Sequence, residues 1–279
     1  MKKMVAAFDG LKFSNSTRDY ALYLSRLTEA HLVGVFMDDP TYTSYKIYDL
    51  VVKEGATDAR IKKFEEKDLL TRQAAATAFE KACRDAGVVY SLHHDRRIAI
   101  QEIKHESIYA DLMLIDGRET LTHYTEKPPT RFIRDLLTDA QCPVLLTPSR
   151  FKPFKKVVLL YDGEPSSVHA IKMFSYLLPE LRDLEAEVLS VNTGKGGHHL
   201  PDNKLMKELM KRHFPSTRFT VLKGNAEEQI IKHLQKAGDQ TLVVLGAYRR
   251  GTVSRWFRES MADTLMRGLK LPLFIAHNK

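Results

Sequence analysis

The feature of the sequence that most restricts its fold is an internal repeat. The stretch MVAAFDG at 4–10 matches VVLLYDG at 157–163, and CPVLL at 142–146 matches LPLFI at 271–275. The first match has an offset of 153 residues and the second has an offset of 129, so the first copy contains about 24 more residues than the second. Most of them follow Phe36. The repeat predicts one fold formed twice along the chain.

Each copy has the size of an ordinary domain. We therefore predict two tandem domains, residues 1–150 and residues 151–279. The join lies in the segment 147–154, where two prolines interrupt any regular element.

Within each copy, short apolar runs alternate with helical patterns. The runs are 4–8, 31–36, 88–93, 112–115 and 143–147 in the first copy, and 156–161, 186–191, 218–222, 242–245 and 272–276 in the second. They are continuously apolar and β-branched, which is typical of strands buried on both faces. The pattern predicts an α/β fold with two doubly wound domains, each a five-stranded parallel sheet covered by helices on both faces.

The helical segments between these runs carry recognisable start signals. Ser166 or Ser167 is predicted to cap one helix, and Asn225 to cap another. A long helix over 58–86 follows the tyrosine-rich insertion 41–50, which contains Tyr42, Tyr45 and Tyr48 and which we interpret as a lid or an interface.

Several motifs resemble those of the universal stress protein family. Asp-Gly pairs at 9–10 and 162–163 close the first strand of each copy, a Gly-Asn-Ala turn at 224–226 opens a helix, and Pro143 or Pro272 opens the last strand. The resemblance covers nearly the whole chain as a tandem pair. It implies that the two domains pack as an intramolecular pseudo-dimer, and many members of the family bind ATP or AMP.

The nucleotide motif of that family reads Gly-x-x-Gly, nine residues, then Gly-Ser or Gly-Thr. In the second copy Gly246 and Ser260 fit, whereas Arg249 and Glu259 replace glycines. Glycines let a backbone approach phosphate, and a serine at a helix N-terminus adds donors. We expect weak binding of ATP, ADP or AMP, with Mg²⁺, or of another anion. The candidate residues are Asp162, Gly163, Val191, Gly246, Arg249, Gly251 and Ser260.

The first copy departs further from the motif. Gly117 is followed by Arg118 and Glu119, and Thr130 stands where a glycine is expected. The carboxylates of Asp116 and Glu119 would repel a phosphate. We expect no ATP in this copy, and the degenerate counterparts of the candidate site are Asp9, Gly10, Phe36 and Gly117. For Asp9 and Asp162 a second interpretation stays open, namely a side chain that caps the following turn.

No motif in the sequence commits the chain to catalysis or to a metal. The loop 246–252 lacks the lysine of a P-loop, and no Gly-x-Ser-x-Gly elbow occurs. The histidine pairs 93–94 and 198–199 lack a carboxylate or cysteine at ligand spacing. We therefore predict no catalytic residues, no metal ligands and no enzymatic activity.

The composition and charge of the chain limit the compartments and the classes of partner that we expect for it. The chain is 43% hydrophobic and 28% charged, as in globular proteins, and no 18-residue apolar stretch predicts a membrane span. Its two cysteines favour a reducing, cytoplasmic compartment. The first 150 residues hold 22 basic and 22 acidic side chains and the rest hold 21 and 13, so the net charge of +8 lies in the second half.

The sequence therefore predicts a non-enzymatic binding or scaffold protein of the stress response, resembling universal stress proteins. A second copy of the chain is a candidate partner, and a membrane is not. One alternative is a slow ATPase or autokinase that uses Asp162 or Ser260. Another is a nucleic-acid-binding module that uses the basic second half, including Trp256 and Phe257 among Arg249, Arg250, Arg255 and Arg258.

Overall fold

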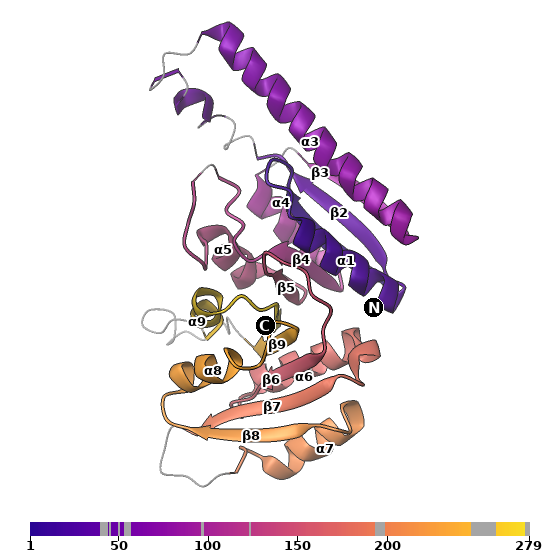
Figure 1. Cartoon of the computed structure of the whole chain (residues 1–279), viewed down its shortest axis with the longest axis vertical. Coiled ribbons are helices and arrows are strands. Elements are labelled where there is room, and N and C mark those ends of the chain that lie inside the picture. Colours follow the sequence, from indigo (N-terminus) through magenta and orange to yellow (C-terminus); the bar gives the residue numbers. More distant parts are fainter. Residues whose placement is uncertain are drawn as a thin grey trace.

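The computed structural model has ten strands that form one sheet with helices packed against it (Figure 1). It describes residues 1–39, 44, 46–49, 51–52, 57–95, 98–122, 124–192, 199–246 and 261–276. Tyr42 and Tyr45 of the insertion therefore lie outside the described residues, whereas Tyr48 is exposed.

Strands and helices alternate through both halves of the chain. The first half contains β1 (Lys3–Asp9), α1 (Asn15–Thr28), β2 (His31–Met37), α3 (Asp58–Ala86), β3 (Tyr90–Asp95), α4 (Ala99–Glu106), the 3-10 helix η1 (Ser107–Tyr109), β4 (Leu112–Asp116), α5 (Arg131–Asp139) and β5 (Val144–Thr147). The second half contains β6 (Lys156–Leu160), α6 (Pro165–Leu177), the 3-10 helix η2 (Pro179–Leu181), β7 (Glu185–Asn192), α7 (Asn203–His213), β8 (Arg218–Lys223), α8 (Ala226–Leu234), β9 (Thr241–Gly246), α9 (Met261–Gly268) and β10 (Leu273–Ala276). These strands confirm the ten predicted apolar runs.

The sheet joins two copies of the same topology. Its strand order is β3-β2-β1-β4-β5-β10-β9-β6-β7-β8, and neighbouring strands are parallel except β5 and β10. These two pair antiparallel, with Leu146 opposite Leu273 and Val144 opposite Ile275. The last strands of the two halves thus form the seam of a pseudo-dimer within one chain, as predicted.

Two hydrophobic cores lie on the two faces of the sheet. Along β1, Met4, Ala6 and Phe8 enter one core while Val5 and Ala7 enter the other, because successive side chains of a strand alternate. Buried residues of α1, α3, α6 and α7 complete the first core, and those of α4, α5, α8 and α9 complete the second. Both cores run through both halves, which confirms the doubly wound architecture.

The helix starts agree with the prediction at one position and differ at another. Asn225 caps α8, since its side-chain oxygen accepts a hydrogen bond from the Glu228 amide at 3.1 Å. The predicted caps of α6, Ser166 and Ser167, are wrong because the helix begins earlier, with Glu164 as its N-cap. Pro165 occupies the first helical position, where its missing amide hydrogen costs nothing.

Helix α3 is the largest departure of the first half from the second. It covers the predicted range 58–86 and projects beyond the sheet in Figure 1. Its buried residues, Ala75, Ala76, Phe79 and Cys83, all lie in its second half. The N-terminal half of the helix is therefore held by few core contacts.

The connection between the halves is fixed by aromatic side chains. Phe151 and Phe154 pack on Tyr20 of α1, with ring centroids 4.8 and 5.4 Å apart, and the Lys152 amide donates to the Tyr20 hydroxyl at 3.3 Å. On the other face, Arg134 of α5 pairs with Asp263 of α9 at 3.1 Å. Contacts on both faces of the sheet thus add to the strand pairing between the halves.

Candidate functional site

The two Asp-Gly turns at the carboxyl edge of the sheet have the same local geometry. Asp9 Oδ1 accepts a hydrogen bond from the Leu11 amide at 2.8 Å, and Asp162 Oδ1 accepts one from the Glu164 amide at 2.9 Å. Both side chains thus cap the turn that follows them. They differ in exposure, because Asp9 is only 3% exposed and Asp162 lies open to solvent.

In the first half, carboxylates already hold the backbone amides of the loop after β4. Glu119 Oε1 accepts hydrogen bonds from the amides of Thr120 and Leu121 at 2.9 and 2.8 Å. Asp116 Oδ1 accepts one from the Arg118 amide at 2.9 Å. Donors of this kind bind phosphate in glycine-rich loops. Here they are occupied by the protein's own anions.

Burial of Glu119 has an electrostatic consequence. The side chain is 7% exposed, and burial, together with the negative charge of Asp9, raises the pKa of Glu119 from 4.5 to about 7. The folded protein therefore binds a proton there more tightly than the unfolded chain does. Ionisation of Glu119 as the pH rises from about 4.5 through 7 lowers the stability of the fold, and the loss persists at higher pH.

We expect Glu119→Gln to remove the fall in the free energy of unfolding that Glu119 causes as the pH rises. The amide oxygen of glutamine can still accept from Thr120 and Leu121, but the side chain no longer ionises beside Asp9. Urea unfolding measured from pH 5 to pH 8 should show the variant gaining stability relative to the wild type as the pH rises. Glu126→Gln, at an exposed carboxylate that accepts from the Arg131 amide, is the control and should follow the wild type. Parallel profiles for Glu119→Gln and the wild type would contradict the raised pKa.

A side chain of the long helix covers the ends of β1 and β2. Arg72 of α3 donates to the Met37 carbonyl at 3.0 Å and pairs with Asp38 at 3.1 Å. With Gly10 and Phe36 it lines a pocket of about 160 Å³. A Cβ added at Gly10 would come within 3.1 Å of the Arg72 Cγ, so the arginine lies directly over this turn.

The predicted counterparts in the first half therefore separate into two places. Gly10 and Phe36 line one pocket with Arg72, and Asp9 lies close enough to Glu119 for its charge to act on that side chain. Gly117 instead lines a different pocket of about 350 Å³, against Lys270 and Leu271 of the second half. No sequence motif pointed to Arg72, although the insertion before it marks where the first copy differs from the second.

In the second half, Asp162, Gly163 and Gly246 lie at the first turn of α6, whereas Val191 does not. Gly163 adopts a φ of +87°, and a Cβ there would lie 2.7 Å from the Pro201 Cβ. Gly246 ends β9 against α6, where a Cβ would lie 2.4 Å from the Ser166 carbonyl oxygen. Val191 on β7 is half-buried and packs on the core formed with α8 and α9. The predicted residues Arg249, Gly251 and Ser260 lie outside the described residues.

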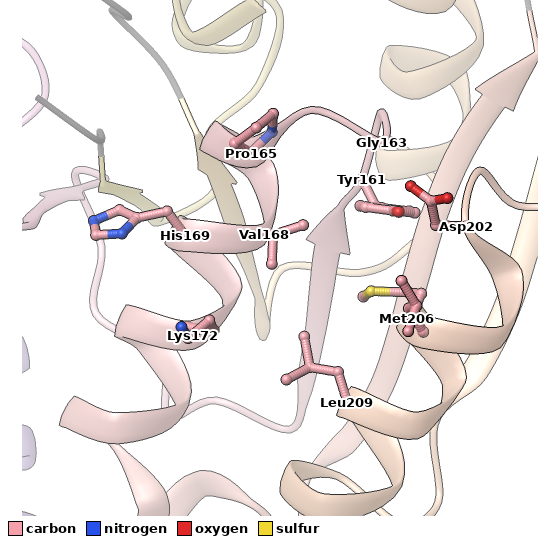
Figure 2. A pocket seen from close by; sticks show the side chains of 10 residues that line it. Tyr161, Gly163, Pro165, Val168, His169, Lys172, Asp202, Met206 and Leu209 are labelled. Atoms are coloured by element: carbon pink, nitrogen blue, oxygen red, sulfur yellow. The ribbon is translucent and has the colours of Figure 1, made fainter.

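A groove of about 460 Å³ opens from Gly163 between α6 and α7 (Figure 2). Val168 and Lys172 of α6 form one side, and Met206 and Leu209 of α7 form the other. Asp202, which precedes α7, lies at its upper end. None of these side chains belongs to the predicted site, because the sequence motifs mark strand ends and not the gap between two helices.

Structural neighbours identify the fold. The chain matches a universal stress protein from Archaeoglobus fulgidus DSM 4304 with a TM-score of 0.70, at 14% identity, over 99% of this chain and 98% of that one. The fold is that of the universal stress proteins. A putative universal stress protein from Pseudomonas aeruginosa UCBPP-PA14 matches with a TM-score of 0.61 and 15% identity, over 99% of this chain and 93% of that one. A protein of unknown function from P. aeruginosa PAO1 matches with a TM-score of 0.60 and 14% identity, over 99% and 92%. No family model and no curated protein matches the sequence.

Within this tandem universal stress protein fold, the two carboxyl edges are unequal. The first is closed by Glu119, Asp116 and Arg72, while the second presents an exposed Asp162 and the adjoining groove. In the part of the chain that the structure describes, no cluster of three or more histidine, cysteine or acidic side chains is placed to hold a metal ion. The same residues include no helix with the length and apolar character to cross a bilayer.

Proposed function

We propose that this chain is a non-enzymatic binding or scaffold protein of the stress response, with a structural first half and a ligand site in the second half. The observation that carries the proposal is the occupation of the loop amides after β4 by Glu119 and Asp116. A phosphate would have to displace these two carboxylates from the loop amides and would be repelled by their negative charge. The tandem universal stress protein fold supports the broader role.

The proposed ligand is an adenine nucleotide, ATP, ADP or AMP with Mg²⁺, or another anion. Ligands of doubly wound sheets bind at the carboxyl ends of the strands, where Asp162, Val191 and Gly246 stand. The sequence after Gly246 supplies Arg249, Gly251 and Ser260, whose donors and charge suit a phosphate. We propose that Arg249 replaces the missing glycine as an anion donor and that Asp162 lies beside the nucleoside.

The proposal also includes a cytoplasmic location and a candidate surface for a homodimer. Cys83 and Cys142 are buried in cores on opposite faces of the sheet, which supports a reducing cytoplasm. Since β5 and β10 pair inside the chain, a homodimer would have to use another surface. The outer strands β3 and β8 are the remaining edges of the sheet.

Native mass spectrometry tests the ligand, first on protein purified without added nucleotide and then during titration with Mg-ATP. We expect one nucleotide per chain. Arg249→Ala should weaken binding about tenfold or more, because a hydrogen bond to a charged group contributes about 1.5–3 kcal/mol. Arg118→Ala is the matched control in the first half and should leave binding unchanged.

Three results would contradict the proposal. Absence of any bound nucleotide at millimolar Mg-ATP would leave a scaffold without this ligand. Equal affinity of the Arg249→Ala variant would remove the arginine from the site. Turnover of labelled ATP by the purified protein would overturn the non-enzymatic role.

A further inference from the structure

The groove between α6 and α7 has a direction that the two helices define. Both helices follow parallel strands and therefore begin at the carboxyl edge of the sheet and run the same way. Pro165 begins α6, and Asp202 immediately precedes α7. Lys172 lies seven residues after Pro165, and Leu209 lies seven after Asp202, which places both about 10 Å lower. Figure 2 shows the same order, with Lys172 and Leu209 below Tyr161 and Asp202.

The upper end presents a carboxylate beside an aromatic ring. Asp202 is the N-cap residue of α7, but its side chain forms no cap hydrogen bond and no ion pair with any other residue that the structure describes. Its φ is +41°, an uncommon backbone conformation for a residue other than glycine. The Tyr161 ring next to it is held in place, since its hydroxyl donates to the Pro201 carbonyl at 3.1 Å. A carboxylate beside an aromatic ring is suited to an ammonium group.

The walls of the groove are apolar. Val168 faces Met206 and Leu209 across the gap in Figure 2. Leu205 at the rim is 66% exposed, so the apolar lining continues to the protein surface. The volume of about 460 Å³ lies within the usual range of small-ligand pockets.

The lower end presents a cation. Lys172 is exposed and has no ion pair among the described residues. The neighbouring His169 remains neutral at pH 7, because burial and the charge of Lys172 lower its pKa. The groove therefore has an anion at its upper end, a cation toward its lower end and apolar walls between them.

We propose that this groove binds a short apolar peptide of about three residues with both termini free. Its ammonium would lie at Asp202 and Tyr161, its carboxylate at Lys172, and its apolar side chains against Met206 and Leu209. Three extended residues span about 10 Å, which is also the rise along α6 from Pro165 to Lys172. The groove meets the proposed nucleotide site at Gly163, but it runs along the sides of the helices, whereas the nucleotide site lies over the strand ends, so the other groove residues named here belong to the groove alone.

Isothermal titration calorimetry with the tripeptide Leu-Leu-Leu tests this proposal. We expect one peptide per chain. The N-acetylated and the C-amidated peptides should each bind about tenfold more weakly, because each loses one charged contact. Asp202→Asn should bind the free and the acetylated peptide equally, and Lys172→Gln should bind the free and the amidated peptide equally. Asparagine tolerates the left-handed backbone at 202, and position 172 is exposed, so both variants should fold.

The control variant is Lys204→Gln, which removes a charge from an exposed position of α7 outside the groove and should bind all three peptides as the wild type does. Absence of binding by the free tripeptide would overturn the proposal. So would equal affinity of the wild type for the blocked peptides. Displacement of the peptide by Mg-ATP would place it in the nucleotide crevice and would also overturn it. Failure of nucleotide binding alone would leave the peptide site standing.

Discussion

Glu187→Ala is expected to destabilise the second half by about 3–5 kcal/mol, since it removes one partner of a buried ion pair. Glu187 is the third residue of β7 and is 1% exposed. Its carboxylate forms an ion pair with Lys156 Nζ at 2.7 Å and accepts a hydrogen bond from Thr220 Oγ1 at 2.6 Å, and His233 Nε2 lies 3.1 Å away. The variant leaves Lys156 largely buried without its nearest anion, and it leaves a cavity between β7 and α8.

The effect of this substitution should depend on pH. Burial alone would raise the pKa of Glu187, but the hydrogen bonds from Lys156, Thr220 and His233 outweigh it and lower the pKa to about 2. Because the folded value lies below the ordinary value of 4.5, the stabilisation is complete above about pH 4.5 and is lost as the pH falls toward 2. The difference between wild type and variant should therefore shrink below pH 4.5.

Urea unfolding followed by circular dichroism measures both effects. Glu185→Ala is a close control, because Glu185 lies two residues away on the same strand and also approaches Lys156, at 3.6 Å. Its side chain is half exposed, so its loss should cost at most about 1 kcal/mol. Equal losses for the two variants would show that burial of Glu187 does not strengthen its contacts.

A related cluster lies in the first half, but there a helix provides the acid and a strand provides the histidine. There Glu106 comes from α4 and His93 from β3, and their side chains meet at 2.5 Å, with Lys3 at 3.5 Å from the carboxylate. In the second half the acid lies on a strand and the histidine on a helix. Lys3 and Lys156 begin β1 and β6 and are related by the same offset as the Asp-Gly pairs, so the repeat extends to the lysines of the two clusters.

Elements that depend on local pattern could be predicted from the sequence. The buried strands were predictable because a short, continuous apolar run between turn signals is typical of a strand buried on both faces. Even Glu187, a single charge inside the run 186–191, did not obscure β7. The family resemblance predicted that the two domains pack as a pseudo-dimer, whereas the pairing of β5 with β10 that forms its seam was not predicted from the residues of either strand.

Features that depend on contacts between distant segments could not be predicted. Arg72 lies over Gly10 because α3 crosses the strand ends, and no spacing in the sequence relates the two residues. Asp202 lies at the groove because α7 packs beside α6, and in the sequence it is one acid after a proline. Likewise, the closure of the first loop depends on the direction of the Glu119 side chain, although its charge alone predicted an unfavourable phosphate site.

Gly246→Ala is expected to destabilise the protein by about 3 kcal/mol with no ligand present, as overpacking of a close contact does. A Cβ at this position would lie 2.4 Å from the Ser166 carbonyl oxygen and 2.9 Å from the Ser167 amide nitrogen. Both atoms belong to the backbone of the first turn of α6, which cannot move without disturbing the Asp162 turn before it. The glycine therefore has a packing role whether or not it also approaches a phosphate.

Gly117→Ala at the equivalent strand end of the first half provides the matched control. A Cβ there would meet the Leu146 Cβ at 3.6 Å, an ordinary contact, so this variant should unfold at nearly the same urea concentration as the wild type. A large loss at Gly246 and a small one at Gly117 would mean that reduced nucleotide binding by Gly246→Ala cannot be assigned to the phosphate contact, and Arg249→Ala becomes the decisive variant. If Gly246→Ala instead folds like the wild type, the close approach of α6 does not require this glycine. A loss of nucleotide binding by that variant would then place Gly246 at the phosphate.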